Sequence, residues 1–278
     1  MRNGIALLFS LVAANCAATQ LTPSTERVFE SYVANVEARL AMQHAKPETY
    51  LAAVPTDAND RNAWERRLDS GDIQVAAING GTWQVDRALL HHWRGAAFVL
   101  DAAPQDMITL LRDFNHSSGH YAPEVVSTRV LTDNGQTANI AVRLKEQKVL
   151  TIVLDAEFTV ETRLSGNDRG YSASRSTHVW QIDNPGTSEE RRRPHGEDDG
   201  FLWHLNSYWS FTRASLRDSG RQGLLIECEA VSLTRDIPVG LGWLIAPIIA
   251  DFPRETLGST LRSTKKALIE NVAQENKR

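Results

Sequence analysis

Carboxylates and an arginine on two neighbouring strands are the first residues whose spacing suggests chemistry. Alternation along residues 149–164 places Asp155, Glu157 and Glu161 on one side of a strand, and Arg175 lies on the strand expected to pair with it. On the concave side of a sheet, a buried carboxylate–arginine pair would mark the polar end of a pocket. On the convex side, the same residues would form exposed pairs worth well under about 1 kcal/mol each. The exposed arrangement is favoured, because charged side chains are seldom buried.

Two histidine pairs are candidates for metal binding or proton transfer. His116 and His120 have the spacing that puts two imidazoles on one side of a helix. Gly119 indicates that the helix has already ended, so a solvated helix end is the better interpretation and we expect no metal site and no cofactor. His91 and His92 are adjacent in a predicted strand and face opposite sides. Either one enters a ligand cavity, or one packs under N-terminal helices while the other is exposed, which we favour.

The hydrophobic pattern predicts the elements that position these residues. We expect helices over residues 24–42, 61–68 and 105–114, with Val28, Tyr32, Val36 and Leu40 as the apolar side of the first. Strands are expected over 89–100, 125–131, 139–144, 149–164, 170–182, 201–212 and 224–235, and the glycines at 80–81 break the chain before the first of them. The chain ends in an amphipathic helix that runs to about residue 273 and is segmented at its start by prolines 247 and 253.

This order of elements and several short motifs resemble the START/SRPBCC superfamily, and more closely a bacterial branch whose members mostly have no assigned function. The motifs are HHWRG (91–95), DFNH (113–116), YAPEV (121–125), SRST (174–177), GFLW (200–203), SYW (207–209), ECEAVSLTRDIP (227–238), GLGWLIAP (240–247) and PRE (253–255). The resemblance covers roughly residues 80–270. It implies an α+β helix-grip fold, in which a curved antiparallel sheet wraps around a long C-terminal helix and a ligand cavity lies between them. The superfamily includes lipid carriers, polyketide cyclases and oxygenase subunits, but this chain lacks a Rieske Cys/His pair.

The resemblance turns an aromatic strand into the candidate ligand site. Alternation puts Phe201, Trp203, Leu205, Trp209 and Phe211 on one side of residues 201–212. Such a row usually forms core, but in a helix-grip fold the core and the cavity wall are the same surface. We therefore expect ligand contacts from Trp203, Leu205, Trp209 and Phe211.

Polar ligand contacts are expected from His92 and Arg175, and no catalytic residue is assigned. Small residues on the last strand, Cys228, Ala230 and Ser232, should let the C-terminal helix approach the sheet. Cys228 itself is expected to be a small buried apolar group.

The N-terminus resembles a targeting segment. Arg2 precedes an apolar run at 5–14, and Cys16 and Ala18 stand at the −3 and −1 positions of a plausible cleavage site. The run is shorter than the ~20 residues of a membrane-spanning helix. We therefore expect a signal peptide at 1–18, an N-terminal helical extension at 19–80, a START-like domain at 81–278, and a periplasmic or secreted protein. An uncleaved apolar helix and a lipid anchor through Cys16 remain as alternatives.

The composition and the absence of certain motifs exclude several classes of function. A net charge of −4 and a single Arg191–Arg193 cluster flanked by acidic residues give no basis for nucleic-acid binding. A nucleophile elbow and a phosphate loop are absent from the sequence. We therefore expect a protein that binds a hydrophobic small molecule or lipid without catalysis. The alternative is a cyclase- or hydrolase-type enzyme that acts on an apolar substrate in the same cavity.

The N-terminal helix is expected to pack on the outer side or edge of the sheet, with peripheral membrane contact as its alternative.

Overall fold

The computed structural model describes residues 20–147, 151–194, 197–236 and 242–275, with side chains in the last range from residue 252 onward. The expected signal peptide at 1–18, including Cys16, lies outside the described residues. The same holds for residues 149 and 150 of the long predicted strand, for residues 240 and 241 of the GLGWLIAP motif, and for the side chains of the rest of that motif.

The described strands form one antiparallel sheet in the order β1-β2-β9-β8-β6-β5-β4-β3, with the short β7 paired to β6. Their bounds are β1 Gln74–Val85, β2 Ala88–Leu100, β3 Val125–Asp133, β4 Thr137–Gln147, β5 Thr151–Ser165, β6 Arg169–Asp183, β7 Arg191–Arg192, β8 His204–Ser215 and β9 Gln222–Arg235. All strands of the predicted set are present, because alternating apolar and polar residues favour a half-buried strand. β9 lies near the centre, and its side chains are buried on both faces.

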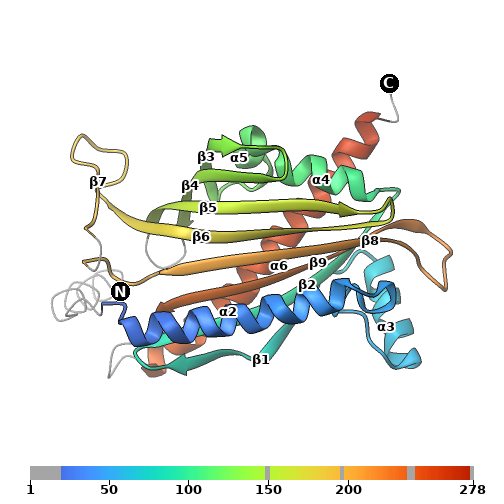
Figure 1. Cartoon of the computed structure of the whole chain (residues 1–278), viewed down its shortest axis with the longest axis horizontal. Coiled ribbons are helices and arrows are strands. Elements are labelled where there is room, and N and C mark those ends of the chain that lie inside the picture. Colours follow the sequence, from blue (N-terminus) through green and yellow to red (C-terminus); the bar gives the residue numbers. More distant parts are fainter. Residues whose placement is uncertain (1–19, 148–150, 195–196, 237–241, 276–278) are drawn as a thin grey trace, which may run out of the picture.

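A long helix covers one face of the sheet, which we call the inner face. This helix, α6 (Gly242–Glu275), crosses behind the strands in Figure 1 and packs against β1, β2 and β9. The helix α4 (Pro104–Arg112) packs beside it, followed by the short η2 (Phe114–His116) and α5 (Ser117–His120). An antiparallel sheet packed around a long C-terminal helix confirms the α+β helix-grip fold predicted from the sequence.

A second helix lies along the opposite, outer face of the sheet (Figure 1). This helix, α2 (Pro23–His44), buries Phe29, Val36 and Leu40 against residues of β2, β8 and β9. Val28, expected on the apolar side, is 43% exposed instead, because the buried stripe begins one residue later at Phe29. Beyond α2, the turn η1 (Pro47–Thr49) leads to α3 (Ala58–Asp69), whose Leu68 packs with Phe98 on the same face. The expectation that the extension packs on the outer side of the sheet is confirmed.

The close approach of α6 to the sheet depends on a glycine of β2. A Cβ atom added at Gly95 would lie only 2.4 Å from Leu261 Cδ1 of α6. Cys228, one of the small residues expected to admit the helix, lies directly opposite Gly95 in the neighbouring strand β9. Two adjacent strands therefore supply the space for Leu261, which is fully buried.

Two expectations about chain breaks are wrong. The glycines at 80 and 81 lie within β1, at an irregularity in its pairing with β2, where Gly81 has a φ of +81° and the ring of Trp93 lies against its Cα. Pro253 does not end a helix, because α6 continues through it.

No helix in the described part of the chain is both long and apolar enough to span a bilayer.

Candidate functional site

The inner face of the sheet carries an apolar surface in the region where α6 packs. Trp209 and Phe211 of β8 are 6% and 0% exposed and cluster with Ile226 of β9 and with Leu257 and Leu261 of α6. Every second residue of β8 points to this face, so the strand itself fixes the direction of both aromatic rings. These residues form the predicted core between sheet and helix.

A second apolar cluster occupies the other half of the inner face. It is built by alternating residues of β4 and β5, among them Ile140, Val142 and Phe158, together with Phe114 of η2. Leu205 of β8 is partly buried and packs against this cluster, whereas Trp209, four residues later, belongs to the cluster under α6. The apolar surface of the sheet therefore continues from the strands that α6 contacts to β4 and β5.

A tyrosine hydroxyl and a threonine hydroxyl meet at α6. The hydroxyls of Tyr121, at the end of α5, and Thr264 of α6 share a hydrogen bond of 3.1 Å. Burial raises the pKa of Tyr121 to about 12, so the phenol can donate a hydrogen bond at neutral pH but cannot act as a base. Burial also raises the pKa of the Cys228 thiol, which is 1% exposed. The expectation that this cysteine is a small buried group is confirmed.

The predicted ligand-binding residues separate onto the two faces. Leu205, Trp209 and Phe211 lie on the inner face, as the alternation of β8 requires. Trp203 precedes the first residue of β8, its ring packs with the α2 cluster, and its Nε1 donates to Asp198 Oδ1 at 3.1 Å. The alternation expected from residue 201 therefore does not extend to Trp203, because strand geometry begins only at residue 204.

His92 and Arg175 both lie on the outer face, where α2 covers them. Tyr32 Oη is 2.8 Å from His92 Nδ1, and Arg175 Nε donates to Glu37 Oε1 at 2.5 Å. Glu161 is 4.0 Å from Arg175, so the predicted carboxylate–arginine group also belongs to this face. Ligand contact for His92, Arg175 and Trp203 remains a prediction.

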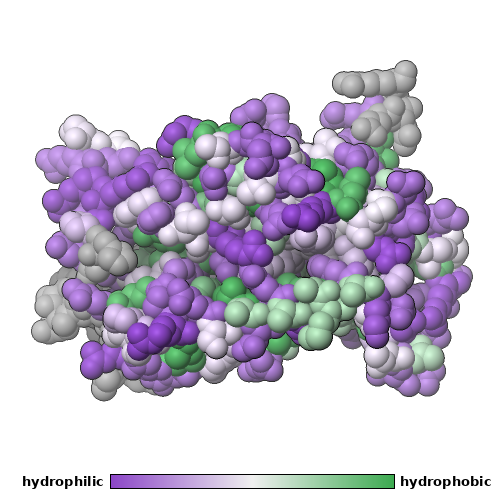
Figure 2. Space-filling view, viewed as in Figure 1, coloured by the Kyte–Doolittle hydropathy of each residue, from purple (hydrophilic) through white to green (hydrophobic). Residues whose placement is uncertain are grey.

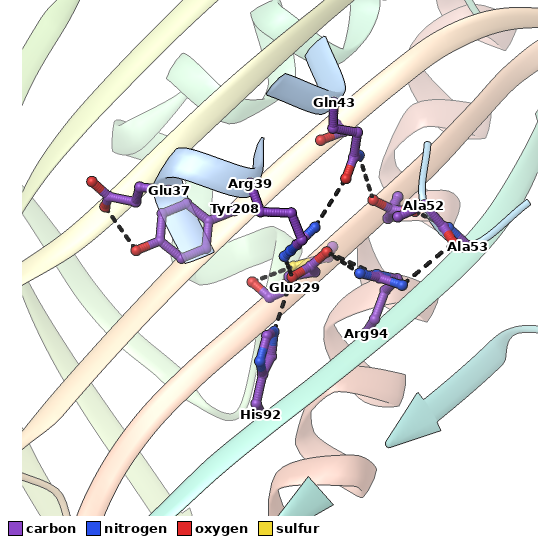
Figure 3. A network of polar contacts seen from close by, with 12 residues as sticks. Glu37, Arg39, Gln43, Ala52, Ala53, His92, Arg94, Tyr208 and Glu229 are labelled. Atoms are coloured by element: carbon purple, nitrogen blue, oxygen red, sulfur yellow. Dashed lines mark hydrogen bonds and ion pairs between the residues drawn. The ribbon is translucent and has the colours of Figure 1, made fainter. Parts of the chain in front are cut away.

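A buried carboxylate on β9 is the centre of a polar network beneath α2 (Figure 3). Glu229 is 1% exposed. Its Oε2 accepts from His92 Nε2 at 2.9 Å and from Arg39 of α2, and its Oε1 accepts from Arg94 Nε at 2.8 Å. Burial alone would raise the pKa of Glu229, but the hydrogen bond from His92 and the two guanidinium groups lower it to about 2. This carboxylate is therefore an ionised anchor for a helix distant in the sequence.

A second buried carboxylate, Glu227, lies two residues before Glu229 on the same face of β9. It accepts a hydrogen bond from the backbone N–H of Ala53 and a long one of 3.4 Å from Gln43 Nε2. Burial raises the pKa of Glu227, and the charge of Glu229 adds to this effect. The pKa values of Glu227 and Glu229 are thus shifted in opposite directions. The sequence did signal them, since acidic residues alternate with apolar ones in an otherwise apolar strand.

Further polar contacts extend the network toward β6 and β8. Tyr208 of β8 is 3% exposed and donates its hydroxyl to Glu37 Oε1 at 2.9 Å, the same oxygen that binds Arg175. His44, at the end of α2, lies 2.8 Å from Ser210 Oγ and stacks between Tyr50 and Tyr171. These contacts run along one side of α2, so the network fixes the orientation of the helix on the sheet.

The histidine pair at 116 and 120 contacts one shared carboxylate. His116 Nδ1 is 2.7 Å and His120 Nε2 3.4 Å from the carboxylate of Asp113, at the exposed end of a broken helical segment. Among the described residues no group of three or more His, Cys, Asp or Glu side chains is arranged to hold a metal ion. His91 is 1% exposed, between the hydroxyls of Thr82 and Thr234, so the expectation of an exposed neighbour for His92 is wrong.

Comparisons with known proteins add structural neighbours. No family model matches the sequence, and no curated protein sequence matches it significantly. Among solved structures, a STAR-related lipid transfer protein fragment from Xanthomonas axonopodis is 16% identical, with a TM-score of 0.39 over 72% of this chain and 98% of that one. Human STARD10 is 9% identical, with a TM-score of 0.42 over 81% and 84%. The ZhuI aromatase/cyclase from Streptomyces sp. R1128 is 13% identical, with a TM-score of 0.36 over 68% and 94%.

Proposed function

We propose that this protein binds a hydrophobic small molecule or lipid between the inner face of the sheet and α6, outside the cytoplasm and without catalysis. The observation that carries the proposal is the extent of the apolar inner surface. It runs from Trp209 and Phe211, which pack near α6, to a second cluster on β4 and β5 that includes Phe158. A sheet face with apolar residues on both halves suits a ligand that lies across them.

The polar groups nearby support binding better than catalysis. Tyr121 and Thr264 carry hydroxyls at α6, where a ligand with one oxygen would find a hydrogen-bond partner. A general base needs a pKa near the working pH, and the raised pKa values of Tyr121 and Cys228 do not provide one. An enzyme of the cyclase or hydrolase kind in the same space is the alternative.

A fluorescence titration with the neutral probe N-phenyl-1-naphthylamine tests the proposal. The wild-type protein should bind it saturably. Leu205→Trp places a larger side chain where β8 meets the β4–β5 cluster, in space that the probe would occupy. It should weaken binding by about tenfold or more, which corresponds to a loss of ~1.4 kcal/mol or more of binding free energy. Met42→Trp is the control, because Met42 of the outer-face helix α2 is 69% exposed.

Absence of saturable binding by the wild type, or equal binding by both variants, would contradict a site on the inner face. Native mass spectrometry of protein purified from its own host complements the titration. A co-purifying lipid supports binding, whereas ligand-free protein that turns over an apolar substrate supports the enzyme.

A further inference from the structure

Two adjoining hollows lie beside α6, between its C-terminal half and the turn that joins α3 to β1. Their volumes are about 580 and 470 Å³, within the range of ~300–1,000 Å³ typical of small-molecule sites. Both are lined by Gly71, Lys265 and Ile269, so together they form one groove. Lys265 follows the buried Leu261 by four residues and precedes the buried Leu268 by three, so it lies on a flank of α6 close to the sheet. The groove therefore runs beside the apolar cluster of the inner face, against which Ile73 and Val272 pack.

One end of the groove is rich in cations. Arg262, Lys265 and Lys266 line it together with Asp72 and Glu270. Lys266 is 3.9 Å from Glu270, a loose ion pair. Lys265 is partly buried, and its Nζ donates to the carbonyl of Gly71 at 3.2 Å. In the part of the chain that the structure describes, no carboxylate lies within ion-pair distance of this ammonium group.

The position of Lys265 is costly for the protein by itself. Burial lowers the pKa of its ammonium group and the charge of Arg221 lowers it further, while the carboxylate of Asp72 opposes these effects in part. A partly desolvated cation gains most from an anion placed directly beside it, because the attraction is stronger where water is excluded. The cationic end is thus suited to an anionic group.

The other end of the groove combines apolar walls with the acidic side chains of Asp69 and Asp101. Phe98, Leu100 and Val272 form its walls, and Ile269, at the boundary between the two ends, is 47% exposed. Arg221 also lines this end, but Asp69 neutralises it at 2.7 Å. An alkyl chain along these walls would remove apolar area from water at a gain of ~25 cal/mol per Å². Lys265 and Ile269 line both hollows, so a cation adjoins apolar walls, which matches a molecule with an anionic head and an alkyl chain.

We propose that this groove binds a single-chain amphiphile with an anionic head, of the fatty-acid class, with its carboxylate at Lys265 and its alkyl chain along Ile269 and Val272. The proposal does not depend on the ligand space of the inner face, because neither the aromatic residues Trp209 and Phe211 of β8 nor the β4–β5 cluster lines the groove.

Calorimetric titration of the full chain with decanoate, below its micelle concentration, tests the groove. Wild-type protein should bind decanoate and should bind the uncharged decanol at least about tenfold more weakly, since a charge-assisted hydrogen bond is worth ~1.5–3 kcal/mol. Lys265→Met keeps the length of the side chain and removes its charge. This variant should bind decanoate at least about tenfold more weakly than the wild type does. Lys46→Met is the matched control, because Lys46 is exposed at the end of α2, outside the groove, and should bind decanoate as wild type does.

A second variant covers the case in which Lys265→Met disturbs the helix. Ile269→Glu changes an exposed residue and places a carboxylate beside the expected head, so decanoate binding should be lost in a protein that remains folded. Leu205→Trp, which fills the inner face, should leave this binding intact even if probe binding there is lost. The proposal is overturned if wild-type protein does not bind decanoate. Equal affinity of wild type, Lys265→Met and Ile269→Glu, or equal affinity for decanoate and decanol, overturns it as well.

Discussion

His92 Nε2 on β2 lies 2.9 Å from Glu229 Oε2 on β9, and both side chains are 1% exposed. His92 Nδ1 faces the hydroxyl of Tyr32 on α2, so one imidazole joins two strands to the N-terminal helix. The same carboxylate binds Arg39 of α2 and Arg94 of β2. The N-terminal extension is therefore held by charge as well as by apolar packing.

Replacing the central carboxylate should destabilise the protein strongly. Glu229→Gln keeps the shape of the side chain but leaves Arg39 and Arg94 near a buried site without their counter-charge. Loss of one partner of a buried ion pair typically costs about 3–5 kcal/mol of unfolding free energy. The arginine side chains are 35% and 15% exposed, so we expect the lower end of that range. Urea denaturation measures the difference.

Glu30→Gln is the control for that experiment. Glu30 lies on the exposed side of α2, so its replacement should change the unfolding free energy by less than about 0.5 kcal/mol. Similar values for the two variants would show that the buried network contributes nothing to stability.

Acid should destabilise the fold through His91 before it protonates the carboxylates. Burial lowers the pKa of His91 from 6.5 to about 4, so the folded state favours the neutral imidazole. The contribution of neutral His91 to the unfolding free energy is complete above pH 6.5. It is lost as the pH falls toward 4, and the loss amounts to up to about 3 kcal/mol. For Glu229, with a pKa lowered from 4.5 to about 2, the loss occurs between those values. The raised pKa of Glu227 acts in the opposite sense, because its contribution is lost as the pH rises.

Thermal unfolding between pH 7 and pH 4 measures this dependence. His91→Gln should flatten the decline relative to wild type, whereas His178→Gln should not, because the His178 side chain is 61% exposed. A decline of equal slope in all three proteins would assign the acid sensitivity to other groups.

The contact of α6 with the sheet should be intolerant of one added methyl group. In Gly95→Ala, the new Cβ would lie 2.4 Å from Leu261 Cδ1 and 3.2 Å from the carbonyl oxygen of Gln74. Overpacking of this kind costs about 1–3 kcal/mol. At Gly119 nothing lies within 4 Å of the new atom, so Gly119→Ala should be neutral or slightly stabilising. The unfolding free energies of both variants test this, and a wild-type value for Gly95→Ala would mean that the helix shifts at no cost.

Export is predicted from the N-terminal sequence alone. Arg2, the apolar run at 5–14 and the small residues before position 19 predict cleavage after Ala18. N-terminal sequencing of the native protein should begin at Thr19 and should find it outside the cytoplasm. An intact Met1 on cytosolic protein would disprove export, and a lipid on Cys16 would establish the anchor instead.

The sequence determined the elements of this protein because their signals are local. Alternation within residues 224–235 specifies a strand, and the spacing of Leu257, Leu261 and Leu268 specifies one side of a helix. Both patterns arise from the geometry of neighbouring residues, so they hold whatever the rest of the chain does. Leu205, Trp209 and Phe211 were placed together on this basis. Trp203 was not placed correctly with them, because alternation cannot locate the residue at which a strand begins.

Only the tertiary structure decided which partner covers each face. The sequence placed Glu227 and Glu229 on one side of β9, but a strand has the same alternation whether that side faces α6 or α2. The pairing of β9 with β2 brings Arg94 beside Glu229, and α2 supplies Arg39 from 190 positions earlier in the chain. A buried charge such as that of Glu229 needs partners of opposite charge beside it. Arg39 and Arg94 are far from Glu229 in the sequence, so only folding brings them to it.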